Sequence, residues 1–254
     1  MGPAPEQSQS SNQPPPRPGD PRWVGTGSPP QRLTDPGVVG NERLTALAGA
    51  VVLVLGVIEL ITVPALHALM AVHIIVGTLL AGPVAVKMAS TAWRFLRYYT
   101  RSPAYRRKGP PRRLLRLLAP LLVASTLGVI GSGIALAITG PAPQVLIVIH
   151  VLSFLVWVIT LAIHVITYLP KVPRLIADDW SRRPTRTGTP GRNTRLASNV
   201  VGLAIGAAAA VLLLPAIPAW TSWGAANGTK FLVVAAVATL IGAAVTRRSR
   251  HRDS

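Results

Sequence analysis

The stretch that decides the fold is "IHVLSFLVWVITLAIH", residues 149–164, an apolar run with a histidine at each end. It lies within a longer apolar run, residues 144–169. An α-helix rises about 1.5 Å per residue, so about 20 apolar residues cross a hydrocarbon layer roughly 30 Å thick. The stretch therefore predicts a membrane-spanning helix that carries two histidines.

The rest of the chain has the same character, since half of its 254 residues are apolar and the mean hydropathy is +0.44. Six apolar runs have the required length: 44–63, 65–92, 114–139, 144–169, 196–217 and 229–246. They predict an all-α polytopic membrane bundle with six transmembrane helices. We expect a four-helix core over 43–170 and two additional helices over 196–246. Little sequence remains for a separate domain, which excludes a large soluble catalytic domain.

Basic residues are placed asymmetrically along the chain, which has 26 Lys and Arg against 8 acidic residues. Nine of them lie in 94–116, seven in 171–195 and four in 247–252. The other connections between spans hold none apart from Lys230. This alternation follows the positive-inside rule and predicts a multi-pass protein with both termini in the cytoplasm. Nucleic-acid binding is not expected, because aromatic residues do not alternate with the basic ones on a folded platform.

Three segments outside the spans are predicted to be cytoplasmic. Residues 1–42 are rich in Pro, Ser, Gln and Gly and predict a disordered tail. Residues 171–195 form a basic loop, and 247–254 form a basic tail. The chain has no cysteine, so it holds no disulfide and no iron–sulfur cluster, and redox chemistry requires another cofactor.

Four of the five histidines lie in only two spans: His67 and His73 in 65–92, and His150 and His164 in 144–169. Ionisable groups inside a bilayer are costly, about 2.5–3.5 kcal/mol for a charge at the centre, and they often mark a functional site. His150 and His164 are fourteen residues apart, which is about four helical turns, so they share one face at heights about 21 Å apart. Trp157 lies midway on the same face.

A haem iron held by two imidazoles requires histidines at equal depth on two neighbouring helices. Both histidine-bearing spans run inward, and His73 lies eight residues beyond Ala65 while His150 lies six beyond Gln144. The difference in depth is only about 3 Å. We therefore expect His73 and His150 to be the axial metal ligands of one haem near the outer side.

A second haem has no matching ligand pair. The residue fourteen positions beyond His73 is Lys87, and a protonated lysine has no lone pair for iron. Its long side chain near the cytoplasmic boundary is explained by snorkelling. His164 then either forms a hydrogen bond within the bundle or pairs with His67.

Three further residues are candidates for the functional site, and each also has an explanation that involves no function. His67, near the start of its span, is either an interfacial histidine or an alternative axial ligand. Gly77, one turn beyond His73, either makes room for a porphyrin or serves ordinary packing. Glu59 is the only acid within a span and is a candidate proton site, for a quinone or for a protonated His67. It is otherwise an interfacial acid in contact with water.

Two parallel helices with histidines fourteen residues apart on one of them resemble the four-helix b-type cytochromes of respiratory complexes and the six-helix ferric-reductase-like membrane cytochromes. The segment "KMASTAWRFLRYYTRSPAYRRKGPP" is also similar to one in actinobacterial membrane proteins, which implies a bacterial cytoplasmic membrane. The resemblance implies haem b in the bundle and a separate dehydrogenase, reductase or quinone as redox partner. By this resemblance His73 and His150 match the outer ligand pair and His164 matches half of the inner pair, whereas Lys87 departs from the pattern.

Three functions are consistent with the sequence. The preferred one is a b-type cytochrome-like electron-transfer subunit rather than a catalytic one. The second is a cofactor-free membrane scaffold, in which hydroxyl groups of residues such as Ser132 or Thr160 satisfy the histidines. The third is a proton or cation transporter lined by His73, His150 and Glu59, although the uniformly apolar spans lack the broken helices typical of transporters.

Overall fold

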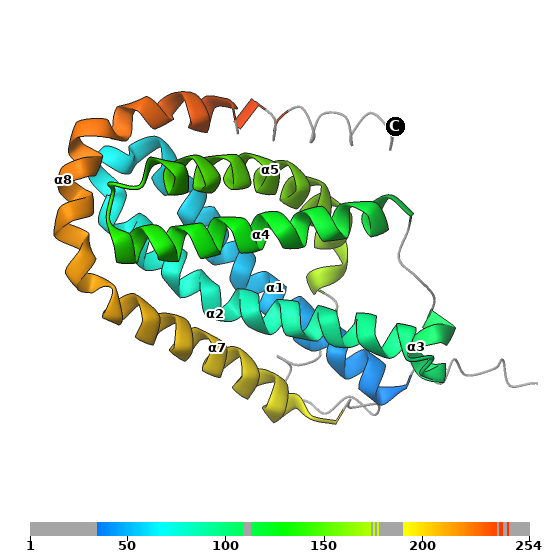
Figure 1. Cartoon of the computed structure of the whole chain (residues 1–254). Coiled ribbons are helices and arrows are strands. Elements are labelled where there is room, and N and C mark those ends of the chain that lie inside the picture. The colour runs from blue at the N-terminus through cyan, green and yellow to red at the C-terminus, as the bar shows by residue number, and fades with distance from the viewer. Residues whose placement is uncertain are drawn as a thin grey trace, which may run out of the picture. The chain divides into compact units, whose positions relative to one another are not determined.

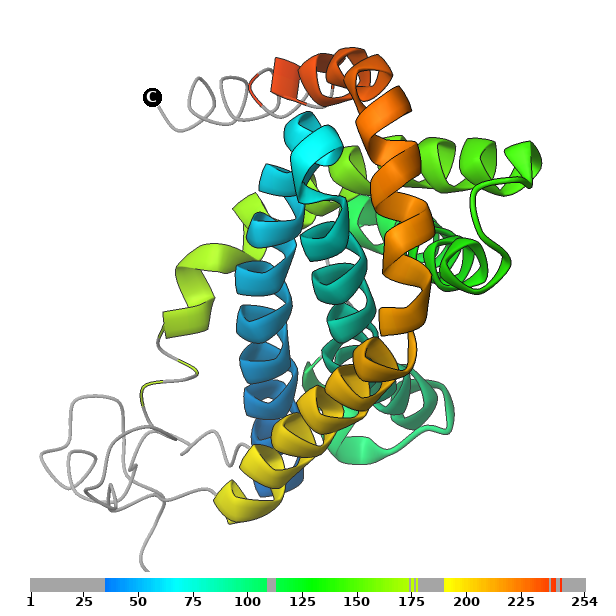
Figure 2. The same cartoon turned by 90° about the vertical axis from the view of Figure 1, so that its left-hand side faces the viewer.

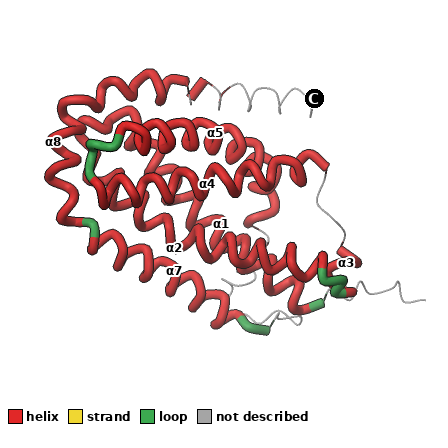
Figure 3. The backbone as a smooth tube through the Cα atoms, viewed as in Figure 1, coloured by secondary structure: helices red, strands yellow, loops and turns green. Residues whose placement is uncertain are grey.

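A computed structural model describes residues 35–108, 113–173, 175, 177, 190–237, 239, 240 and 243 of the chain. Helices joined by short loops make up this part of the chain, and it contains no strand (Figure 3). The predicted all-α class is confirmed. Residues 1–34 and the basic tail 247–254 lie outside the described residues, as does most of the predicted loop 171–195.

The first hairpin consists of α1 (Pro36–Thr62), the 3₁₀ turn η2 (Val63–Ala65) and α2 (Leu66–Tyr99). The chain reverses at η2, so α1 and α2 lie side by side (Figure 2). α2 continues past the predicted span 65–92 to Tyr99. These two helices form one wall of the site described below.

Helix α1 begins earlier than predicted. The carboxylate of Asp35 accepts hydrogen bonds from the backbone N–H groups of Gly37 at 2.8 Å and Val38 at 3.3 Å, and Pro36 occupies the first turn. An aspartate cap followed by proline is a strong helix start. The prediction that residues 36–42 belong to a disordered tail was therefore wrong.

The second hairpin follows the short helix α3 (Pro103–Lys108) and consists of α4 (Arg113–Thr139) and α5 (Gln144–Tyr168), which ends in η3 (Leu169–Lys171). Gly140 ends α4 with φ +78°, and its N–H donates to the Leu136 carbonyl at 2.8 Å. This left-handed conformation favours glycine because it has no Cβ. α4 and α5 then lie side by side (Figure 1).

The last described part contains α7 (Arg192–Leu212), η4 (Leu214–Ala216), α8 (Ile217–Asn227) and η5 (Gly228–Phe231). α7 packs on α2 through a stripe of small residues. The space that a Cβ would need at Gly206 is taken by the Leu79 carbonyl, which has lost its helical partner because Pro83 has no N–H. The backbones of the two helices approach this closely because glycine has no side chain.

Helix α8 was not predicted, because its residues were assigned to a connection between two spans. It crosses the end of the α1–α2 hairpin (Figure 1). Trp220 of α8 is buried with Leu66, Met70 and Leu136, and its indole N–H donates to the Leu136 carbonyl at 3.2 Å. α8 therefore closes one end of the space between the hairpins.

Four segments of the described chain are long and apolar enough to cross a membrane: Pro36–Tyr99, Arg116–Thr139, Gln144–Tyr168 and Arg192–Leu212. The first contains both α1 and α2. The predicted span 229–246 lies partly outside the described residues, and its place as a sixth membrane helix stays a prediction. Large apolar side chains cover the outer faces, such as Leu117, Val145 and Leu212, each more than 70% exposed. These faces are compatible with contact with a lipid bilayer.

Candidate cofactor site

A cavity of about 920 Å³ lies between the two hairpins. Its walls are apolar side chains of α1, α2, α4 and α5, and Trp220, Trp223 and Phe231 line it as well. Each hairpin is closely packed within itself, but α2 approaches α4 at few places and the two hairpins are otherwise well separated. The volume is within the range of about 300–1,000 Å³ typical of ligand pockets. The cavity therefore has room for a molecule of tetrapyrrole size.

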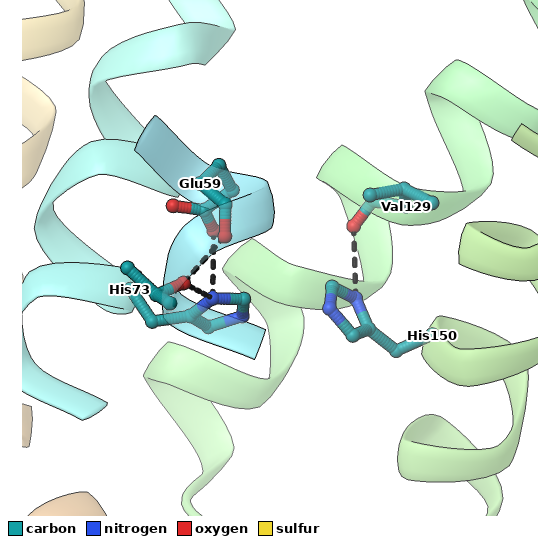
Figure 4. Close-up of polar contacts among 5 residues, drawn as sticks. Glu59, His73, Val129 and His150 are labelled. Atoms are coloured by element: carbon teal, nitrogen blue, oxygen red, sulfur yellow. Dashed lines mark hydrogen bonds and ion pairs between the residues drawn. The ribbon is translucent and has the colours of Figure 1, made fainter. Parts of the chain in front are cut away.

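His73 of α2 and His150 of α5 face each other across this cavity (Figure 4). Their ring centres are 6.3 Å apart and their planes are at 86°. A metal–imidazole bond is about 2 Å long and a ring nitrogen lies about 1 Å from its ring centre, so two imidazoles on opposite sides of one metal have centres about 6 Å apart. The separation matches that arrangement.

The Nδ1 atom of His150 has hydrogen-bond partners in its own hairpin, on α4. Nδ1 lies 3.0 Å from the Val129 carbonyl oxygen and 3.1 Å from the Ser132 hydroxyl. A carbonyl only accepts hydrogen bonds, and the Ser132 hydroxyl is directed at the carbonyls of Gly128 and Val129, so Nδ1 carries the hydrogen. Nε2 of His150 therefore presents a lone pair.

The Nδ1 atom of His73 likewise has polar partners in its own hairpin, on α1. Nδ1 lies 2.9 Å from the Glu59 carboxylate and 2.8 Å from the Thr62 hydroxyl. Thr62 donates to the Glu59 backbone carbonyl at 2.6 Å, so its oxygen is available to accept from Nδ1. In the neutral ring with its hydrogen on Nδ1, Nε2 of His73 also presents a lone pair.

Neither Nε2 has a hydrogen-bond partner among the residues that the structure describes, and no hydrogen bond joins the two rings. Two lone pairs directed at one apolar gap repel each other unless a positively charged centre lies between them. The geometry thus fits a metal bound by one nitrogen from each hairpin.

Three other residues from the sequence prediction also line the cavity. His164 lies further along α5 with its ring centre 4.7 Å from that of Tyr168. Trp157 lines the cavity between the two α5 histidines and reaches to 3.9 Å from the Cβ position of Gly56. Gly77 lines it too, but the group nearest to its Cβ position is the Glu59 carboxylate, at 2.8 Å.

Three positions differ from the prediction. Glu59 pairs with His73 instead of His67, because the rotation of the hairpin turns the carboxylate toward the cavity. His67 is exposed at the start of α2 and does not line the cavity, so it is not brought to His164. Lys87 was expected to extend to the membrane boundary, but its side chain is directed into the bundle. It lines the cavity, and its Nζ lies 2.7 Å from the Cβ position of Gly49 on α1.

The sequence prediction did not include Thr62 or the Val129 carbonyl. Thr62 follows Glu59 by three residues, and this spacing places both on one helix face. The sequence therefore contained enough information to predict Thr62 as a neighbour of Glu59. A backbone carbonyl leaves no signal in the sequence. Ser132 was expected as a histidine partner only in the scaffold hypothesis, and here it holds one nitrogen of His150 while the other faces the cavity.

The described residues contain no group of three or more His, Cys, Asp or Glu side chains suited to hold a metal ion. Two imidazoles alone suit a metal that brings its remaining ligands with it, as a porphyrin does. Comparisons of this chain with protein-family models, curated protein sequences and solved structures found no match.

Proposed function

We propose that this protein is an integral membrane b-type cytochrome-like electron-transfer subunit that holds one haem b between α2 and α5. His73 and His150 are the axial ligands. The observation that carries the proposal is the pair of unpartnered Nε2 atoms facing each other, with ring centres 6.3 Å apart, in a cavity of about 920 Å³. Both the ligand spacing and the available space suit this group.

Haem, when bound, supplies a one-electron iron couple. The chain holds one imidazole from each hairpin across a cavity with mainly apolar walls, and its outer faces are apolar. The hydrogen bonds to the two Nδ1 atoms fix the ring orientations and adjust the electron density on Nε2. Electrons reach and leave the site through a separate redox protein or a quinone.

The proposed setting is a bacterial cytoplasmic membrane with both termini on the cytoplasmic side. The basic residues of 94–116, on α2, α3 and the start of α4, then lie at the cytoplasmic surface. η2 and α8 lie at the outer surface, which places His73 and His150 nearer to that side.

Two other functions account less well for the histidines. A scaffold without a cofactor does not require two histidines from different hairpins to face each other across a cavity of about 920 Å³. A direct proton path would need one ring to donate to the other, and no hydrogen bond joins the two rings in the described structure.

The test is a dithionite-reduced minus oxidised spectrum of the full chain purified in detergent from cells with ample haem. A sharp b-type band is expected, and it is lost in both His73→Ala and His150→Ala. His67→Ala is the matched control, because His67 lies on the same helix outside the cavity, and it retains the band. A wild-type protein without haem contradicts the proposal.

A further inference from the structure

The two facing histidines have unequal partners on their second nitrogens. Nδ1 of His73 donates toward the Glu59 carboxylate at 2.9 Å. Nδ1 of His150 has only neutral acceptors, the Val129 carbonyl at 3.0 Å and the Ser132 hydroxyl at 3.1 Å. Figure 4 shows the carboxylate on one side of the pair and the carbonyl on the other.

Several groups fix the position of the Glu59 carboxylate. Its Oε1 is directed at His73, and its Oε2 is buried without a hydrogen-bond partner among the described residues. Gly77 leaves the space that the carboxylate occupies, since a Cβ there would lie 2.8 Å from Oε1. Thr62 binds both the backbone of Glu59 and the ring of His73. The carboxylate is thus held in one orientation beside the ring.

The Glu59 side chain is only 16% exposed, and a nearby positive charge stabilises a carboxylate in such a place. A metal ion bound at Nε2 of His73 would supply such a charge across the ring from the carboxylate. A carboxylate that accepts from a ligand imidazole also raises the electron density on the metal-binding nitrogen. Both effects favour the metal in its more positively charged state.

We infer that Glu59 is a positioning residue that makes His73 the more strongly donating ligand and lowers the reduction potential of the bound haem. The inference rests on the proposed function. It assigns to Glu59, the only acid among the described residues that line the cavity, a role in setting the potential, and it makes the two histidine ligands electronically unequal.

The first test is a redox titration of Glu59→Gln, followed at the haem band. Glutamine retains the size of the side chain and an oxygen that accepts from Nδ1, so the ring orientation is kept while the charge is lost. The ratio of reduced to oxidised haem at a fixed potential should rise about tenfold, which corresponds to about 59 mV for one electron. Glu42→Gln is the control, because it makes the same chemical change near the opposite end of α1, beside Arg94. It should leave the ratio of reduced to oxidised haem unchanged.

A second variant leaves Glu59 in place. Gly77→Ala pushes the carboxylate away from His73 and should shift the ratio in the same direction by a smaller factor. Gly131→Ala on α4 is its control, since no atom lies within 4 Å of the Cβ position there. A haem band with the wild-type potential in both Glu59→Gln and Gly77→Ala overturns this inference alone. Absence of the band from the wild-type protein overturns the proposed function as well.

Discussion

His73 on α2 and His150 on α5 stand with their ring planes at 86°, and each ring is fixed by polar groups of its own hairpin. Each hairpin therefore contributes one complete half of the site. Between the halves lies the cavity, where the hairpins have few direct contacts. A molecule bound there would add to the packing that joins the two hairpins.

Removal of the cofactor should therefore destabilise the protein. A ligand at about a thousand times its Kd stabilises the folded state by about 4 kcal/mol, or about 10 °C in Tm for a chain of this size. Protein produced without haem should unfold at a correspondingly lower temperature in detergent. Added haemin should restore the Tm of the wild type and leave that of His73→Ala unchanged. Equal Tm values with and without haem contradict this expectation.

His164→Ala should retain the haem held by His73 and His150. Lys87 lines the same part of the cavity in place of a second ligand, so His164 has no partner for a second iron. The haem-to-protein ratio should be close to one in the wild type and unchanged in the variant, measured by pyridine haemochrome and amino-acid analysis. A ratio near two that falls to one in His164→Ala indicates a second haem.

The contact between α2 and α7 should not tolerate a side chain at Gly206. Gly206→Leu forces leucine atoms onto the Leu79 carbonyl, and this overpacking should cost about 3 kcal/mol or more. Lower yield of folded protein and a lower Tm in detergent are the expected results. Ala207→Leu is the control on the exposed face of the same helix, and it should behave like the wild type.

The proposed orientation is open to a direct test because the chain has no cysteine of its own. Ser222→Cys on α8 and Thr100→Cys at the end of α2 are both exposed single-cysteine positions. A membrane-impermeant maleimide should label Ser222→Cys in intact cells and Thr100→Cys only after permeabilisation. The reverse pattern places the termini outside.

The sequence by itself determined the helical class, the separate spans 44–63 and 65–92, and the shared face of His150, Trp157 and His164. In a bilayer every backbone N–H and C=O must be satisfied within its own segment, so an apolar run of sufficient length forms a helix wherever it packs. Helical spacing then fixes which residues share a face. The equal depth of His73 and His150 followed from counting along two such helices.

Only the tertiary structure decided that Glu59 faces His73, that Lys87 turns inward and that α8 crosses the end of the hairpins. α1 and α2 are apolar on nearly every side, so the pattern of residues does not fix how each helix is rotated about its axis. That rotation depends on close contacts between distant segments, such as Gly206 against Leu79, and on the cavity that separates the two hairpins. The same rotation places the two Nε2 atoms opposite each other.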